Sequence, residues 1–404
     1  FLPTIFSHQN NIAMAYQGHI PIVQALPSGP QLTNDIQKRP SQYLLPPQSG
    51  GRAPELQKDE IRQLKDQGFS IGLAKALSFA TATFPLRIWV VDNSGSMQKN
   101  DGHRTVETSQ KNHVKIVQST RWTEIKECIN YHSQMAGLLR APTSFRLLND
   151  PGAMVGPQRF GIAEMGPESI PQDVQQVREI MSRAKPSGVT PLTQHVIDIQ
   201  QIVREMAPQL KHEGKRVAII LATDGLPTNA QGYGGEDESN LFVQSLRSLE
   251  GLPVWVVIRL CTDEDDVVDF YNDLDEQLEL SIEVLDDFVG EANEVYKHNS
   301  WLNYALPLHR CREFGFHDRV FDMLDERTLT KEELRDFCAF LFGMDNFDGI
   351  ADPSVDWKKF MKEINALLEK EDTQWNPVKN KVTPWIDMKH LNETYGDGSN
   401  CRVM

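Results

Sequence analysis

The amino-acid sequence predicts an α/β fold with a doubly wound, mostly parallel sheet flanked by helices, followed by a helical C-terminal extension. Short apolar runs such as residues 88–91 and 217–221 have the length and composition of buried strands. Segments of helical periodicity separate these runs, and this alternation is typical of parallel sheets. Beyond about Pro307 the strand pattern stops and only helical patterns follow. The sheet is therefore expected in the middle of the chain.

Composition limits what the chain can do. Its 404 residues, of which 40% are hydrophobic, can bury one large core and a second, smaller one. The net charge of −15 argues against unaided binding to nucleic acid or to an anionic membrane surface. No apolar run approaches the roughly 20 residues that span a bilayer. The five cysteines are odd in number and lack CxxC spacing, which predicts reduced thiols in a cytosolic protein and neither disulfides nor a zinc site.

Shifts in composition suggest five regions along the chain. Residues 54–84 carry two short helical patterns, which we expect to flank the sheet, because a ubiquitin-associated domain would need a third helix before the strand at Ile88. Residues rich in Pro and Gln predict a disordered tail at the start of the chain. The expected regions are a tail at 1–53, a helical flank at 54–84, the α/β domain at 85–306, a helical region at 307–392 and a flexible tail at 393–404.

The elements of the central domain follow from hydrophobic periodicity and from helix start and stop signals. The expected strands are residues 88–91, 144–148, 159–163, 217–221, 253–260 and 280–285. The expected helices are residues 122–139, 170–184, 192–210, 241–249 and 265–274, with another from residue 289. Residues 99–120 form a polar insertion that ends in an alternating stretch, and this predicts a hairpin beside the loop that follows the first strand.

That loop carries the strongest functional signal. Asp92, Ser94 and Ser96 alternate directly after the apolar run, and Gly95 lets the backbone curl so that their oxygens can converge. Ligands bind at such strand ends in open α/β sheets. One carboxylate and two hydroxyls form a hard-oxygen set, which suits Mg²⁺ or Mn²⁺ better than zinc.

Two later segments add the same kinds of oxygen ligand. Thr190 lies in residues 187–193, a Ser- and Thr-containing loop that precedes a helical pattern. Asp224 follows the apolar strand at 217–221, within the tripeptide Thr223-Asp224-Gly225. Like the Asp92 loop, these segments lie at a predicted strand end or helix start and carry oxygen groups.

The three loops together resemble the metal-ion-dependent adhesion site of von Willebrand factor A domains, the family that includes integrin I domains. The resemblance implies that Ser94, Ser96 and Thr190 contact Mg²⁺ or Mn²⁺ through their hydroxyls. It also implies that Asp92 and Asp224 act mainly through coordinated waters, which leaves a metal position for an exposed Asp or Glu of a protein partner. On this interpretation the chain is a protein-binding module and not an enzyme.

The alternative is a metal-dependent hydrolase or phosphatase that uses the same Asp92 loop. A haloacid-dehalogenase-type phosphatase needs a second carboxylate two residues after the first, where this sequence has Ser94. A serine hydrolase would need GxSxG, and the first glycine is missing. These departures favour the binding module.

The last four residues, Cys401-Arg402-Val403-Met404, fit a CaaX prenylation signal of the farnesyl class, although Arg402 departs from the aliphatic pattern. One prenyl chain gives only marginal membrane binding. We therefore expect a eukaryotic, cytoplasmic protein whose membrane association through Cys401 is peripheral and weak.

Overall fold

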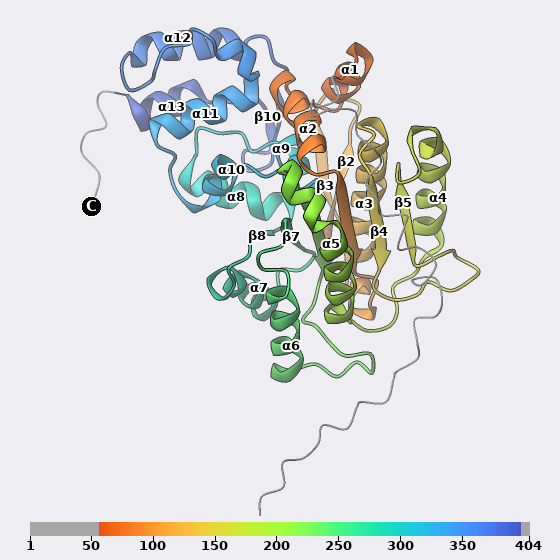
Figure 1. Cartoon of the computed structure of the whole chain (residues 1–404). Helices are drawn as coiled ribbons and strands as arrows, with labels where there is room; N and C mark the ends of the chain where they lie inside the picture. The colour runs from red at the N-terminus through yellow and green to blue at the C-terminus, as the bar shows by residue number, and fades with distance from the viewer. Residues whose placement is uncertain (1–55, 397–404) are drawn as a thin grey trace, which may run out of the picture. The chain divides into compact units, whose positions relative to one another are not determined.

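A six-stranded sheet lies at the centre of the computed structural model, which describes residues 56–396 (Figure 1). Its strand order is β5-β4-β1-β6-β7-β8, and every neighbouring pair is parallel except β4 and β5. The strands are β1 (Leu86–Val91), β4 (Thr143–Leu147), β5 (Arg159–Ile162), β6 (Val217–Thr223), β7 (Val254–Leu260) and β8 (Ile282–Leu285). The predicted α/β class with a mostly parallel sheet is confirmed, and β5 is its antiparallel edge.

The direction in which the chain crosses the sheet reverses beside β1. From β1 the chain reaches β4 and β5 on one side, and it then returns to β6, β7 and β8 on the other side. The carboxyl ends of β1 and β6 are therefore neighbours at a topological switch point, where open α/β sheets bind ligands. Val91 pairs with Ala222, and the Asp92 N–H continues the ladder by donating to the Ala222 carbonyl at 2.8 Å.

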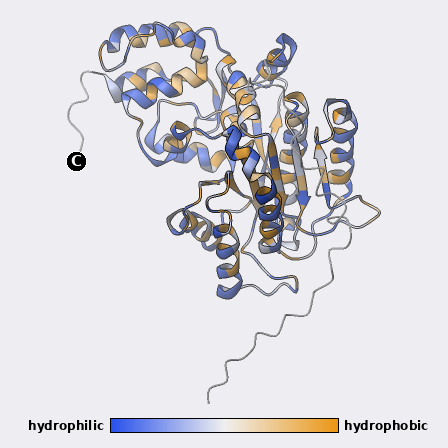
Figure 2. Ribbon diagram, in the orientation of Figure 1, coloured by the Kyte–Doolittle hydropathy of each residue, from blue (hydrophilic) through white to orange (hydrophobic). Residues whose placement is uncertain are grey.

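Thirteen α-helices surround the sheet in the described part of the chain. Trp89 and Val91 point into a core shared with α3, α4 and the C-terminal helices, whereas the alternate residues Ile88 and Val90 are buried on the opposite face, where α5 crosses the sheet (Figure 1). The central strands are consequently rich in apolar residues, and polar residues are frequent on the helices (Figure 2). The first seven helices are α1 (Lys58–Asp66), α2 (Ile71–Thr83), α3 (Arg121–Leu138), α4 (Ile170–Arg183), α5 (Leu192–Glu213), α6 (Glu236–Arg247) and α7 (Asp265–Gln277). The other six are α8 (Phe288–His298), α9 (Leu306–Glu313), α10 (Arg319–Glu326), α11 (Lys331–Phe342), α12 (Trp357–Leu368) and α13 (Met388–Tyr395).

Helix α6 begins five residues before the predicted helix at 241–249. Its first turn is Glu236, Asp237 and Glu238, which apolar periodicity does not detect. Acidic side chains in a first turn interact favourably with the positive end of the helix dipole. The Gly-rich loop after β6 is correspondingly shorter than expected.

The predicted hairpin in the insertion is confirmed as β2 (Gly102–Glu107) paired antiparallel with β3 (Val114–Ser119). Its far end contacts the C-terminal part of the chain: the ring of His113 lies 4.5 Å from that of Trp375. Trp375 belongs to β9 (Gln374–Asn376), which pairs with β10 (Lys381–Thr383). The hairpin therefore connects the loop after β1 to the segment that precedes α13.

The C-terminal helices share one core with the sheet instead of forming a second one. Arg87 of β1 is fully buried. Its guanidinium donates to the Phe314 carbonyl at 3.0 Å and lies 4.0 Å from the centre of the Phe314 aromatic ring. On α2, the Ser70 hydroxyl caps the helix by accepting from the Leu73 N–H and donates to the Leu341 carbonyl of α11. Within residues 56–396, no helix combines the length and apolarity needed to cross a membrane.

Helices α2 and α11 pack closely at Gly72, and we expect Gly72→Ala to disrupt this contact. A Cβ at Gly72 would lie 2.0 Å from the Phe340 carbonyl oxygen, and backbone cannot move aside as a side chain can. Overpacking should lower the free energy of unfolding by about 2 kcal/mol or more in urea unfolding. Gly137→Ala is the control. Its Cβ would be 3.0 Å from a methyl of Ile170, which belongs to a side chain and can move slightly, so a smaller loss of stability is expected. Equal stabilities of the two variants would contradict this packing argument.

Candidate metal centre

Asp92 stands at the end of β1 with both carboxylate oxygens hydrogen-bonded. Oδ1 accepts from the Ser94 N–H at 2.7 Å, which closes a turn around the loop. Oδ2 accepts from the Thr223 hydroxyl of β6, also at 2.7 Å. The side chain has no exposed surface. These bonds fix the carboxylate at the edge of the sheet, facing the end of β6.

A chain of side-chain oxygens continues from this loop to β6. The hydroxyl oxygens of Ser94 and Ser96 lie 2.9 Å apart, and the Ser96 hydroxyl donates to Asp224 Oδ1 at 2.7 Å. Asp224 directly follows β6 and is 2% exposed. The structure thus brings together four of the five predicted metal ligands through side-chain contacts.

Thr190, the fifth predicted ligand, reaches the same place through the backbone of its loop. The Gly95 N–H donates to the Gly188 carbonyl at 3.1 Å, so the two loops lie against each other. The Thr190 N–H donates to the Thr228 hydroxyl, and the Thr228 N–H donates to the Thr190 carbonyl, both at 2.9 Å. Thr190 itself is buried. Its position is therefore fixed between the loop after β1 and the loop after β6.

Arg121, the first residue of α3, is a component of the site that the sequence did not predict. The Arg121 side chain is 1% exposed, and its guanidinium donates to Asp224 Oδ2 at 3.0 Å. It also pairs with Asp101 at 2.6 Å and with Glu264 at 2.7 Å. A single Arg after a polar insertion carries no local signal, because its partners lie far away in the sequence. Arg121 neutralises part of the negative charge of this edge.

Thr223, Thr228 and Tyr271 were also missed as site residues. Thr223 lies within the tripeptide that contains Asp224, so its proximity could have been inferred, but its bond to Asp92 depends on strand pairing. The Tyr271 hydroxyl of α7 donates to the Gly225 carbonyl at 3.0 Å and anchors the loop after β6. Cys401, the predicted lipidation site, lies outside the described residues, and its modification stays a prediction.

The pKa values of both aspartate carboxyls are raised. Burial, followed by the negative charge of Asp224, raises the pKa of Asp92 to about 6. Burial also raises the pKa of Asp224, although hydrogen bonds from Ser96 and Arg121 oppose the shift. A cation between two buried carboxylates stabilises their charged forms.

The donor set and its spacing fit a small, hard cation. All five predicted ligands offer oxygen, which Mg²⁺ and Mn²⁺ prefer. Two adjacent ligands of an octahedral ion with ~2.1 Å bonds lie roughly 3 Å apart. The 2.9 Å between the Ser94 and Ser96 hydroxyls has this value. The separation of the two serine hydroxyls is therefore compatible with two ligands of one ion.

Comparisons with known proteins assign no family to the chain. None of the protein-family models matches it. A search of curated proteins found no relative either.

The raised pKa of Asp92 leads to a prediction about stability without metal. A carboxyl whose folded pKa exceeds its unfolded value of about 3.9 stabilises the fold in its protonated form, and that contribution is lost as the pH rises through about 6. In chelator at pH 7, Asp92→Asn should therefore raise the free energy of unfolding by about 2 kcal/mol in urea titrations. The gain should vanish near pH 4 and in excess Mg²⁺. A less stable variant at pH 7 in chelator would contradict this assignment.

Proposed function

We propose that the chain is a divalent-cation-dependent protein-binding module of the von Willebrand factor A type. In this proposal Ser94, Ser96 and Thr190 hold Mg²⁺ or Mn²⁺ through their hydroxyls. Asp92 and Asp224 act mainly through coordinated waters. The observation that carries the proposal is the convergence of three oxygen-bearing loops at the switch point between β1 and β6.

The hydrogen bonds of the two aspartates support an indirect role for them. Both oxygens of Asp92 accept bonds from the protein, and so do both oxygens of Asp224. An ion held by neutral hydroxyls keeps most of its positive charge. That charge attracts a carboxylate from outside, so the partner chemistry we propose is an exposed Asp or Glu on another protein.

The surroundings of the site support contact with a protein surface. The loop after β6 carries Tyr233, which is 73% exposed, and neighbouring Gly232 lies against Val189 of the Thr190 loop. An exposed aromatic side chain at the edge of a polar centre is typical of protein interfaces. The partner segment would then place its acidic residue on the ion and an apolar residue beside Tyr233.

The metal assignment predicts a response to Mg²⁺ that depends on Asp224. A ligand that binds only the folded state raises the melting temperature by mass action, so Mg²⁺ should stabilise the intact chain in differential scanning fluorimetry. Asp224→Ala should abolish this shift because it removes a carboxylate from the ion's surroundings. Asp237→Ala, in the first turn of α6, is the matched control and should keep the shift. An unchanged shift in Asp224→Ala would exclude this site.

The two threonines of the loop at 187–193 distinguish the ligand hydroxyl from its neighbour. Thr190→Ala removes a proposed ligand without changing charge, so it should weaken partner capture by about tenfold or more while Mg²⁺ stabilisation is only reduced. Thr193→Ala should have little effect, because the Thr193 hydroxyl donates to Glu238 at 3.3 Å. The measurement is affinity capture from lysate, comparing Mg²⁺ with chelator. The opposite ranking of the two variants would refute the choice of Thr190.

A further inference from the structure

Helices α3 and α9 each present a pair of metal-ligating side chains to the other. Cys128 and His132 are four residues apart on α3, and His309 and Glu313 are four residues apart on α9. Residues with this spacing lie on the same face of a helix. All four side chains are at most 3% exposed. The cysteine spacing predicted no zinc site, and local patterns could not reveal this group because its two pairs are separated by 177 to 185 residues along the chain.

The ligand atoms of Cys128, His132 and Glu313 lie close enough together to surround one ion, and His309 contacts this group through Glu313. The Cys128 sulfur lies 3.4 Å from Glu313 Oε1, and the His132 Nε2 lies 3.0 Å from Glu313 Oε2. The His309 Nε2 lies 3.4 Å from Glu313 Oε1. The ligand atoms of Cys128, His132 and Glu313 all lie within 4.8 Å of one another. Ligands of a zinc ion with bonds of 2.0–2.3 Å are roughly 3.3–3.8 Å apart, so small adjustments would bring the ligand atoms of Cys128, His132 and Glu313 to these distances.

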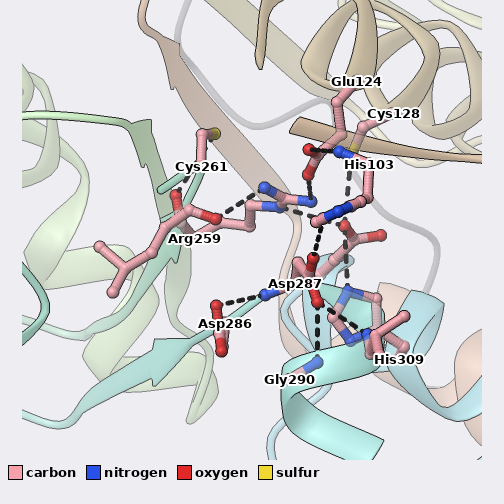
Figure 3. A network of polar contacts seen from close by, with 12 residues as sticks. His103, Glu124, Cys128, Arg259, Cys261, Asp286, Asp287, Gly290 and His309 are labelled. Atoms are coloured by element: carbon pink, nitrogen blue, oxygen red, sulfur yellow. Dashed lines mark hydrogen bonds and ion pairs between the residues drawn. The ribbon is translucent and has the colours of Figure 1, made fainter. Parts of the chain in front are cut away.

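A cavity of about 220 Å³ opens onto this group and offers a route for an ion. Cys128, His309 and Glu313 all line it (Figure 3 shows Cys128 and His309). Its lining contains four carboxylates and three guanidinium groups, which gives a charge of −1 when the histidines are neutral. A zinc ion with one thiolate adds +1, so the occupied cavity would be neutral.

The protonation states and the outer contacts also suit a metal. Burial lowers the pKa of both His132 and His309, which favours the neutral imidazole that binds metals. Burial, and then the charge of Glu313, raises the pKa of the Cys128 thiol, so the thiol is protonated until an ion displaces its proton. Arg310 donates to Glu313 Oε2 at 2.7 Å and orients the carboxylate, a common outer contact of metal ligands.

We propose that Cys128, His132, His309 and Glu313 form a zinc-binding site between α3 and α9. On binding, a zinc–sulfur bond forms, the S–H bond of Cys128 breaks, and the proton passes to solvent through the cavity. A thiolate and two imidazoles select Zn²⁺ over Mg²⁺, so this site is chemically distinct from the oxygen site at β1 and β6. It uses none of the same ligands and does not depend on the proposed function.

Cobalt(II) is the probe, because it replaces zinc in tetrahedral sites and absorbs light there. The metal-free full-length chain, titrated with Co²⁺, should develop intense visible bands and a near-ultraviolet sulfur-to-metal charge-transfer band. Cys128→Ser should remove the charge-transfer band and weaken Co²⁺ affinity by more than about 100-fold, beyond the loss typical of an outer-contact mutation. Cys311→Ser, which changes a different buried thiol, on α9, should leave the charge-transfer band and the Co²⁺ affinity unchanged.

Further variants separate this site from the oxygen site and from a folding defect. Asp224→Ala should keep the cobalt spectrum. His309→Gln keeps the thiol but should lose the stabilisation by Zn²⁺, measured as a melting-temperature shift, even if Cys128→Ser does not fold. Glu313 would otherwise serve only as a hydrogen-bonded centre for Arg259, Arg310 and the two histidines. A chain that shows no tetrahedral cobalt bands, or a charge-transfer band that survives Cys128→Ser, would overturn the proposal.

Discussion

The register between β1 and β6 determines the chemistry of the edge where both strands end. Because the two strands are parallel and Val91 lies opposite Ala222, Asp92 emerges beside Thr223, and Asp224 follows one residue later. Two carboxylates in a dry environment are unfavourable unless positive charge or hydrogen-bond donors compensate for them. The donors are Thr223, the Ser94 N–H, Ser96 and Arg121. The Ser96 hydroxyl, a proposed metal ligand, is therefore also a hydrogen-bond donor that stabilises a buried carboxylate when no ion is bound.

Buried arginines play the same part where the sheet meets the C-terminal helices. Arg312 of α9 donates to Glu283 on β8, to Glu291 on α8 and to Asp325 on α10. Arg259 of β7 reaches Glu124 of α3 in the same way. Removing one partner of a buried ion pair leaves an uncompensated charge and is strongly destabilising. The C-terminal helices thus contact the sheet through charge pairs as well as through apolar packing.

Local patterns were sufficient for the parts of the fold that depend on local physics. Apolar runs gave the six strands, and alternation gave the hairpin in the insertion, because burial and pleating impose those periods directly. The Asp92 loop was recognisable because its ligands are adjacent in the sequence. The Arg121–Asp224 and Cys128–Glu313 contacts could not be recognised in the sequence, since each joins residues more than 100 positions apart. Such pairings exist only after the sheet order and the helix packing are fixed, and no periodicity records them.

Helix α3 reaches both groups of potential metal ligands. Arg121, at its first residue, is bonded to Asp224, and Cys128 lies two turns further on, about 10 Å along the helix axis. The first group offers only carboxylate and hydroxyl oxygens, whereas the second offers sulfur, two imidazoles and one carboxylate. Because hard oxygen ligands favour Mg²⁺ or Mn²⁺ and softer sulfur and imidazole ligands favour Zn²⁺, the two groups would bind different ions even with cavities of equal size. Glu124 lies on α3 between Arg121 and Cys128, and its negative charge is neutralised by an ion pair with Arg259. Helix α3 thus contacts the oxygen group through the Arg121 guanidinium at its first residue, and it contributes a thiol and an imidazole to the second group from its middle turns.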